Sequence, residues 1–430
     1  MKELHHNRQR LRIAVVGSGI SGLASAYFLS KAHHVTLFES GAYFGGHTNT
    51  VDVSLEGTTY PVDTGFLVFN DRTYPNLIAL FQELGVVSHP SDMSFAVSRN
   101  NGQLEWSGTN LDTLFAQRSR LLSPSFLVMV KDILRFNRHA QQHLLSAEQQ
   151  GFSLGELLVT ERYSASFRDN YLLPMAGAIW SSKPADILKF PAATFLRFCM
   201  NHALLQINDR PQWRTVVGGA KEYVKKILAT LSDVRLSTPV RSIHRSEHGV
   251  ELCTDTTREA FDEVVLATHA PASLKLLAHP TPDEQRALGA VHYQHNLAVL
   301  HTDTSLLPRR RKVWSAWNYL TQEAQGHDSP ICVSYLLNQL QPVPFKQPVI
   351  VTLNPIHPPA AKHVIAQFDY EHPVFDLGAI EAQKQVPHLQ GVMHTWFAGA
   401  WTGYGFHEDG LKSALRIASA FGLEPSWTRL

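Results

Sequence analysis

The sequence contains little cysteine. Only Cys199, Cys253 and Cys332 occur in 430 residues, and they are too far apart for a CxxC pair or a metal-ligand cluster. This usage fits a reducing compartment, and we expect a cytoplasmic protein. Histidine is frequent, with 23 residues, but it is scattered, and adjacent pairs such as His5-His6 cannot face one ligand from a regular helix or strand. We therefore expect no metal site.

Long apolar runs and an excess of charge are also missing. No apolar run reaches the roughly 18 residues that a membrane-spanning helix needs. The first run, residues 13–20, is short and glycine-rich and follows a polar segment, so it predicts a strand rather than a targeting signal. The 38 basic and 37 acidic residues give a net charge of +1, which offers nucleic acid no bulk attraction. We expect neither a transmembrane helix nor a nucleic-acid partner, whereas a peripheral contact with the inner face of the membrane stays open.

Glycine, in contrast, is concentrated after the first apolar strand, in Gly17-Ser18-Gly19-Ile20-Ser21-Gly22. In a dinucleotide-binding turn, Gly17 permits the tight turn, Gly19 lets the backbone approach a pyrophosphate, and Gly22 lets the helix pack closely on the sheet. The helix N-terminus then favours the negative phosphates. A second strand at residues 34–39 ends in Glu39, which is placed for ribose hydroxyls. The pair Gly45-Gly46 that follows favours FAD over NAD.

Related motifs return far downstream, at Gly218-Gly219 and between Gly399 and Gly410. We therefore predict an α/β fold with a discontinuous Rossmann-like FAD-binding domain, made of residues 10–72, 209–272 and 390–430. An α+β substrate domain, residues 73–208 and 273–389, is inserted into it. The first insertion reads as mainly helical and the second as mixed. A second GxGxxG motif is missing, so we expect no separate NADPH site.

Together these motifs resemble the flavin-containing amine oxidase superfamily, which also includes protoporphyrinogen oxidase and phytoene desaturase. Residues 44–50, 63–70, 317–319 and 403–410 are similar to a bacterial group of predicted NAD/FAD-binding proteins within it. A relative in that group is the methyl-vaccenate desaturase of furan fatty acid synthesis, which removes hydrogen from a membrane lipid acyl chain. The resemblance implies an FAD-dependent oxidoreductase with the glutathione reductase type 2 fold, and it makes lipid chemistry a candidate activity.

The resemblance also implies a set of cofactor contacts. The pyrophosphate would be held by Gly17, Gly19, Ser21 and Gly22. Glu39 with Ser40 would bind the adenosine ribose, and the backbone of Val240 would contact the adenine, while Gly45, Gly46, His47 and Thr48 would lie along the diphosphate toward the flavin. Gly399, Asp409 and Gly410 would contact the pyrophosphate and the pyrimidine edge of the flavin. Asp409 could equally be a helix N-cap.

The substrate side carries fewer motifs. His407, beside Phe406, stands where monoamine oxidases carry a tyrosine of an aromatic cage, and the loss of that cage disfavours an amine substrate. His407 would act as a base or hydrogen-bond donor, or would only pack against the isoalloxazine. Trp317 and Tyr319 follow the basic run at residues 309–312. They would face the substrate with the run at the cavity mouth, or would be core residues beside a solvated loop.

A helix expected at residues 121–136 is flanked by arginines. It would lie in a lipid headgroup plane, or it would be internal with snorkelling arginines, which is the arrangement we expect. The sequence therefore predicts an enzyme that takes a hydride from a hydrophobic, lipid-linked substrate to FAD. One alternative is a flavin amine oxidase that releases hydrogen peroxide. Another is a flavin-binding protein without redox turnover, either an isomerase or an assembly partner of lipid enzymes. The oligomeric state, the electron acceptor and covalent attachment of FAD are not predicted.

Overall fold

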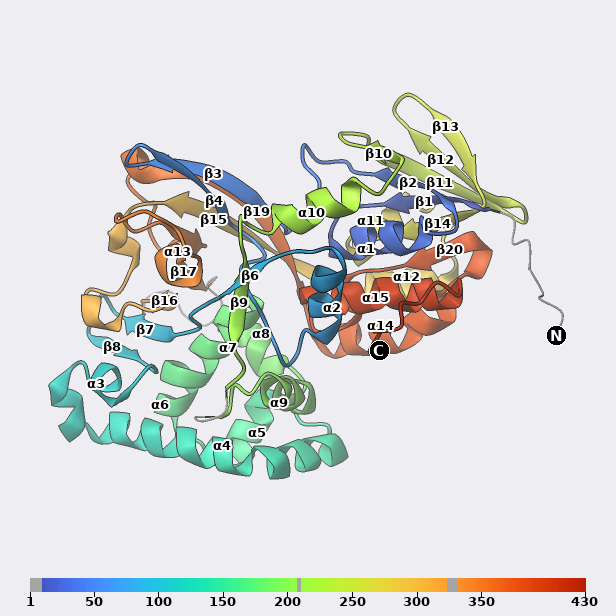
Figure 1. Cartoon of the computed structure of the whole chain (residues 1–430). Coiled ribbons are helices and arrows are strands. Elements are labelled where there is room, and N and C mark those ends of the chain that lie inside the picture. Colours follow the sequence, from blue (N-terminus) through green and yellow to red (C-terminus); the bar gives the residue numbers. More distant parts are fainter. Residues whose placement is uncertain (1–9, 207–209, 323–330) are drawn as a thin grey trace.

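The computed structural model describes residues 10–206, 210–322 and 331–430. The predicted domain boundary between residues 208 and 209, and most of the polar amino-terminal segment, lie outside these ranges. Figure 1 shows two lobes, and the long strands β15 (His292–His301) and β19 (Val364–Val374) run from one toward the other.

The first lobe is built on a five-stranded parallel sheet. Its order is β10 (Asp233–Arg235), β2 (His34–Phe38), β1 (Arg12–Val16), β14 (Glu263–Leu266) and β20 (Thr395–Phe397). These strands come from three separated parts of the chain, and the α/β class predicted from the sequence is confirmed. Because all strands are parallel, their carboxyl ends meet at one edge, which is where ligands bind in such sheets.

Side chains of successive residues in β1 enter two different cores. Ile13 and Val15 are fully buried against α1 (Ile20–Leu29) and α15 (His407–Ala420). Ala14 and Val16 pack on the opposite face, beneath an antiparallel sheet of β11 (Val240–Ser246), β12 (Gly249–Thr254) and β13 (Arg258–Phe261). This alternation follows from the two-residue period of a strand, and each buried aliphatic side chain contributes about 1.5–3 kcal/mol. The sheet is therefore covered on both faces.

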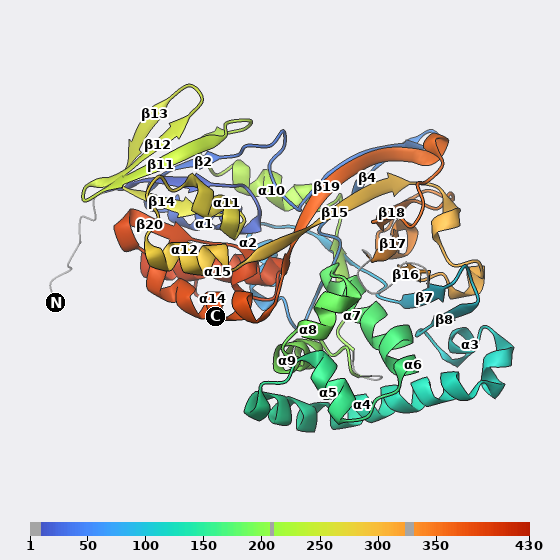
Figure 2. The ribbon, with the colours of Figure 1, turned by 180° about the vertical axis from the view of Figure 1, so that it is seen from behind.

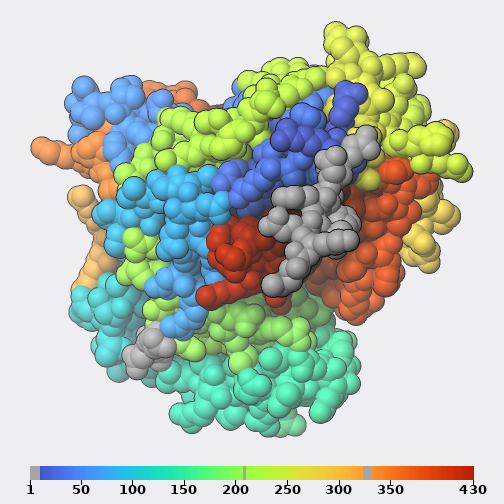
Figure 3. Space-filling model, turned by 45° about the vertical axis from the view of Figure 1, so that its right-hand side comes forward, coloured from blue at the N-terminus to red at the C-terminus, as the bar shows by residue number. Residues whose placement is uncertain are grey.

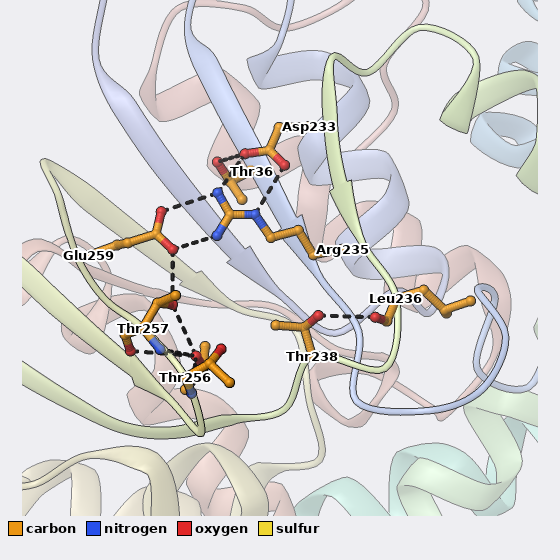
Figure 4. Close-up of polar contacts among 9 residues, drawn as sticks. Thr36, Asp233, Arg235, Leu236, Thr238, Thr256, Thr257 and Glu259 are labelled. Atoms are coloured by element: carbon orange, nitrogen blue, oxygen red, sulfur yellow. Dashed lines mark hydrogen bonds and ion pairs between the residues drawn. The ribbon is translucent and has the colours of Figure 1, made fainter.

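An ion-pair network fixes the edge of this sheet beside Glu39. Figure 4 shows Arg235 of β10 between two carboxylates, Asp233 on its own strand and Glu259 on β13. Arg235 Nε donates to Asp233 Oδ1 at 3.1 Å, and Thr36 donates to Asp233 Oδ2 at 2.9 Å. The carbonyl of Arg235 accepts the amide of Glu39 at 2.9 Å. The network thus ties three strands together next to the acid predicted to bind ribose.

The second lobe contains a seven-stranded sheet and a group of helices. The sheet order is β19, β15, β18 (Ile350–Leu353), β17 (Cys332–Leu336), β16 (Trp317–Thr321), β7 (Phe95–Arg99) and β8 (Leu104–Ser107). The helices are α3 (Leu111–Leu114), α4 (Pro124–Gln150), α5 (Leu154–Thr160), α6 (Ala165–Phe167), α7 (Leu173–Trp180), α8 (Pro184–Lys189) and α9 (Ala192–Asn201), with a 3-10 turn η1 (Arg118–Leu122) before α4 and a π-helical turn at Arg168–Leu172. Figure 2 shows α4 along the outer side of this helical group.

The first insertion is mainly helical, as expected, but residues 88–107 within it form strands that the sequence did not predict. These strands are β6 (Ser88–Pro90), β7 and β8. β6 pairs with β9 (Trp213–Val216) and β7 pairs with β16, both far away in the sequence, whereas β8 pairs with the neighbouring β7. The pairing of β6 and β7 with such distant strands is not specified by a local pattern.

The remaining elements complete the two lobes. The strands among them are a hairpin of β3 (Thr50–Leu55) and β4 (Thr58–Asp63) and the short β5 (Phe69–Asn70). The helices are α2 (Pro75–Glu83), α10 (Lys221–Leu228), α11 (Ala270–Leu276), α12 (Pro282–Gly289), α13 (Leu337–Leu340) and α14 (Leu377–Leu389). Single 3-10 turns lie at Thr304–Leu306, Arg311–Val313, Ala361–His363, Val392–His394 and Ala400–Thr402. Figure 3 shows the light-blue surface of α2 beside the red carboxyl-terminal segment. Beneath the surface, the buried carboxylate of Glu408 accepts the backbone amides of Asn76 and Leu77. Within the described part of the chain, no helix is both long and apolar enough to cross a bilayer. All three cysteines are buried free thiols.

Candidate active site

A cavity of about 570 Å³ lies where the two lobes meet. One part of its wall comes from the carboxyl edge of the parallel sheet, including the loop at Gly17–Ser21 and the segment Gly45–His47. The other part comes from the second lobe, including Trp317 of β16 and Phe198 of α9. The cavity therefore joins the predicted nucleotide cradle to the predicted substrate domain.

The glycines of the first loop differ in what surrounds them. A methyl group on Gly22 would stand 1.8 Å from the carbonyl oxygen of Gly17, so the start of α1 approaches the first strand too closely for any side chain. A methyl group on Gly19 would meet no atom within 4 Å, although Gly19 lines the cavity. The space above Gly19 is therefore open for a ligand at the N-terminus of α1, as a pyrophosphate site requires.

Glu39 lies beside this loop. Its Oε2 accepts the amide of Ser18 at 2.9 Å and the Ser18 hydroxyl at 2.5 Å. Its Oε1 accepts the amide of Gly41 at 2.7 Å, and Ser40 lies next to it on the cavity wall. The carboxylate is thus held in place at the end of β2, where ribose hydroxyls would meet it.

His407 lies deeper in the cavity, at the start of α15. Its ring is stacked on Phe66, with the centroids 3.6 Å apart and the planes 15° apart. Its Nε2 is 3.0 Å from Oγ1 of Thr48 and 3.4 Å from the hydroxyl of Tyr223. Burial lowers the pKa of His407 to about 3, so the imidazole is neutral near pH 7. A group with that pKa is a poor proton acceptor at neutral pH.

The residues present fit an FAD molecule. The open glycine turn, the fixed carboxylate of Glu39 and the cavity that runs from them to His407 provide the three parts that a dinucleotide with a flavin ring needs. The family described as flavin containing amine oxidoreductase matches residues 20–420. The chain belongs to this family.

A search of curated proteins finds no match. Solved structures are similar over 96% of the chain. A conjugated-linoleic-acid-producing fatty acid isomerase from P. acnes has 16% identity, a TM-score of 0.65 and 98% of its own chain covered. A putative protoporphyrinogen oxidase from Exiguobacterium has 16% identity, a TM-score of 0.68 and 99% covered. Cyclohexylamine oxidase from Brevibacterium oxydans has 17% identity, a TM-score of 0.68 and 100% covered.

These comparisons confirm several predictions. The fold is that of the amine oxidases, the cofactor is a flavin, and the protein is a flavin-dependent oxidoreductase of this family. At such low identities the solved structures show the fold alone, and they do not identify the substrate of this family member.

The structure brings most of the predicted site residues to the cavity wall. Gly17, Gly19, Ser21, Glu39, Ser40, Gly45, Gly46, His47, Gly399, Trp317, Phe406 and His407 line it. Gly22 and Thr48 lie directly behind this wall, in contact with Gly17 and His407. The ring of Phe406 is stacked on Phe198 at 5.1 Å. Their contacts with the cofactor and substrate stay predictions.

Four further predicted residues do not line the cavity. Tyr319 is buried behind it, against Gly177 of α7. Val240 packs in the core with Phe38. A methyl group on Gly410 would stand 2.7 Å from Ile20, so this glycine permits close packing of α15 on α1. Asp409 accepts the amide of Phe406 at 3.0 Å and thereby caps the first turn of α15; burial raises its pKa to about 6.

Sequence reasoning missed a group of residues on the long strands. Tyr370 and His372 of β19 and Tyr293 of β15 line the cavity, together with His269 at the end of β14. They carry no local motif. Tyr370 and His372 meet His47 from β19, His269 meets it from the end of β14, and Tyr293 stacks on His269. Sequence reasoning also did not predict the hydrogen bonds of the buried Asp63. Its carboxylate accepts the backbone amide of Ala220 at 2.9 Å and the side-chain amide of Gln341 at 2.8 Å.

Proposed function

We propose that this enzyme oxidises an uncharged, hydrophobic substrate, and specifically a lipid-linked acyl chain. The observation that carries this proposal is the lining of the substrate side. Most of it is aliphatic or aromatic, namely Leu67, Val68, Met93, Ile179, Trp180, Phe198, Leu204, Trp213, Trp317, Tyr335, Leu353 and Phe375. Among the described residues that line the cavity, Glu39 and Glu371 are the only carboxylates. Glu39 is held by Ser18, and Glu371 pairs with His269 at 3.1 Å.

This lining discriminates between substrate classes. A cationic amine would lose its hydration without gaining a free carboxylate partner, which costs several kcal/mol. An acyl chain, in contrast, gains about 0.8 kcal/mol for each methylene group that it buries. When bound, the flavin supplies the hydride acceptor, while the chain's own residues orient the substrate and exclude water. We propose that Trp317 and Phe406 do this on the substrate side, and that neutral His407 is a positioning residue that holds Thr48.

We propose that the two lobes bind different molecules. We propose that residues 10–72, 209–272 and 390–430 bind FAD through Gly17, Gly19, Ser21, Gly22, Glu39, Ser40, Gly45, Gly46, His47, Thr48, Val240, Gly399, Asp409 and Gly410, and that residues 73–208 and 273–389 bind the substrate. The five-stranded sheet, which gathers strands from all three of the first segments, supports this division.

We also propose a peripheral contact with the inner face of the membrane. Six large apolar side chains are exposed within α3, η1 and the start of α4: Leu111, Leu121, Leu122, Leu127, Val128 and Leu134. Figure 1 shows α3 at the same corner as the start of α4. The basic run at Arg309–Lys312 joins this corner through an ion pair of Lys312 with Asp112. Exposed leucines flanked by basic side chains are suited to an anionic lipid surface.

An anaerobic reduction experiment tests the substrate proposal. Holoenzyme is mixed without oxygen with phospholipids that carry methylated acyl chains, or with cyclohexylamine or putrescine, and the visible flavin absorbance is followed. We expect bleaching by the acyl substrate and a product that has lost two hydrogens. Bleaching by the amines alone, with hydrogen peroxide after oxygen returns, would instead establish an amine oxidase. A product of unchanged mass without net bleaching would establish an isomerase.

A matched pair of methionine variants tests whether the apolar wall of the cavity binds the substrate. Met93 lines the cavity, whereas Met393 is 43% exposed far from it. Met93→Glu places a carboxylate among apolar side chains, and we expect it to lower kcat/KM for the acyl substrate by on the order of tenfold or more. Met393→Glu should leave kcat/KM unchanged. Equal activity of both variants would contradict an apolar binding wall.

A further inference from the structure

The part of the cavity wall that the structure describes carries no permanent positive charge. Among the described residues that line it, there is no lysine and no arginine. Its basic groups are five imidazoles, those of His47, His202, His269, His372 and His407. A bound FAD brings a diphosphate that is negative at both phosphates. Helix N-termini and backbone amides balance part of this charge, and among the described side chains of the wall a histidine that takes up a proton would add positive charge.

His47 is the imidazole closest in the chain to the phosphate loop. It directly follows Gly45-Gly46, and a methyl group on Gly46 would stand 3.2 Å from Cα of Gly19. The ring of His47 is stacked on Tyr370, with centroids 5.1 Å apart, and its Nε2 is buried without a hydrogen-bond partner among the described residues. A buried polar atom without a partner is uncommon in folded proteins and points to a missing ligand.

His47 belongs to a cluster of imidazoles contributed by several elements. His372 of β19 lies 5.2 Å from it and His269, after β14, lies 6.4 Å from it, measured between ring centroids. His407 of α15 also acts on His47 electrostatically. The one carboxylate in the cluster is Glu371 of β19, which pairs with His269. The other ionisable groups facing the cluster are the phenols of Tyr370 and Tyr293, and that of Tyr43 on the loop before Gly45.

Burial and mutual repulsion keep these imidazoles neutral in the protein without ligand. Burial, followed by the neighbouring His372, His269 and His407, lowers the pKa of His47 well below its ordinary value, and a hydrogen bond with the backbone of Glu371 opposes this shift. Burial likewise lowers the pKa of His372 to about 4 and lowers that of His269, against the opposing effect of Glu371. A diphosphate nearby acts in the opposite direction, since an anion favours the protonated form.

We propose that FAD binding is coupled to proton uptake, and that His47 is the residue that takes the proton beside the pyrophosphate. The proton comes from solvent and returns to it when FAD leaves, and no bond in FAD is broken. The inference rests on the flavin cofactor and does not depend on the proposed substrate. It predicts that FAD is held more tightly at lower pH, because the complex binds more protons than the separated partners.

The dissociation of holoenzyme tests this coupling. Holoenzyme is diluted at a series of pH values, free FAD is measured by its fluorescence, and an indicator dye in weak buffer counts the protons released with it. We expect Kd to rise by up to about tenfold per pH unit between the lowered pKa of His47 in the flavin-free protein and its higher pKa in the complex, with up to about one proton released per FAD. A Kd that does not change with pH and no proton release in the wild-type protein would overturn the proposal. Dissociation of a non-flavin compound would instead overturn the flavoprotein assignment.

Three variants assign the proton. His47→Arg carries a permanent charge, so it should retain FAD with a Kd that no longer depends on pH and with no proton release. His47→Gln should bind FAD about tenfold more weakly near pH 6 and should also lose the proton release. His248→Gln, at an exposed turn, is the matched control and should behave as wild type. Proton release that persists unchanged in His47→Arg would overturn the role of His47.

Discussion

The ring of His407 lies parallel to that of Phe66 at a centroid distance of 3.6 Å, while its Nε2 is 3.0 Å from Thr48. Phe66 follows the hairpin of β3 and β4, and His407 opens the last helix, so this contact joins two distant parts of the chain. The imidazole is thus fixed on its face and at its edge. A side chain held in this way positions its neighbours more readily than it moves protons.

We expect His407→Gln to change the rate of turnover without changing the shape of its pH dependence. With a pKa of about 3, the imidazole of wild-type His407 does not titrate between about pH 6 and pH 9. Both enzymes should therefore give kcat profiles of the same shape, while kcat of the variant falls because the Thr48 hydroxyl loses the imidazole and, among the described residues, keeps only its hydrogen bond with Tyr223. A step near neutral pH in wild type that disappears in His407→Gln would show proton chemistry at His407.

Two glycine variants should fail in different ways. Gly19→Val projects its side chain into open cavity, so the protein should fold with an unchanged Tm in its flavin-free form but should lose FAD. Gly22→Ala pushes a methyl group to within 1.8 Å of the Gly17 oxygen and should lower the stability of the fold itself, by about 1–3 kcal/mol. The flavin content of purified protein and thermal unfolding distinguish the two effects. A yellow, FAD-loaded Gly19→Val would contradict the pyrophosphate site.

The parts of the site that lie within one short segment could be predicted from the sequence. The loop from Gly17 to Gly22 and the acid at Glu39 belong to one strand–turn–helix–strand unit, in which spacing reports geometry directly. The later segments of the FAD-binding domain, at Gly218 and Gly399, could also be predicted, because each has a glycine after a strand or before a helix. Asp409 was ambiguous because an acid in the first helical turn serves a cap as well as a ligand, and in the structure it caps α15.

The cluster around His47 could not be predicted in this way. His269 and His372 reach His47 through the parallel sheet and through the pairing of β15 with β19, whose partners are more than 60 residues apart. Tyr319 shows the opposite error: it is two residues from Trp317 on the same strand, yet it lies behind α7 while Trp317 lines the cavity. Whether a strand residue lines the cavity depends on which other elements pack over it. A single sequence does not show this packing.

Asp63 should make the stability of the protein depend on pH. Burial, opposed by hydrogen bonds from Thr50 and Ala220, raises its pKa to about 6 from 3.8. A carboxyl with a raised pKa contributes stability that is present below about pH 4 and lost as the pH rises through about 6. The free energy of unfolding of wild type relative to Asp63→Asn should therefore fall by up to about 3 kcal/mol between pH 4 and pH 7.

Denaturant unfolding of both proteins at each pH measures this difference. Taking the difference between the two proteins removes the opposing contributions of other carboxyls such as Glu83, whose pKa is lowered. The Asn variant should be less stable throughout, because Gln341 donates to Asp63 Oδ2 at 2.8 Å and an amide nitrogen there cannot accept. A difference that grows as the pH rises would show that Asp63 is charged and stabilising in the folded protein.

The apolar corner formed by η1 and α4 should determine binding to lipid. Leu122 is 88% exposed and Leu121 is 48% exposed, and Arg118 and Lys131 are exposed beside them. We expect wild-type protein to sediment with anionic phosphatidylglycerol vesicles and much less with neutral ones, and we expect binding to weaken as salt is added. Replacing both leucines by serine removes the side chains that would enter the bilayer, and should weaken binding by about tenfold or more.

Leu145→Ser is the matched control for this prediction, because Leu145 is 51% exposed near the other end of α4. It should bind vesicles as wild type does, and all three proteins should keep the same flavin content, since none of these leucines lines the cavity. Turnover of an acyl substrate presented in vesicles should fall with binding in the double variant, whereas turnover of the same substrate in detergent micelles should not. Equal vesicle binding by wild type and the double variant would show that this corner does not contact the membrane.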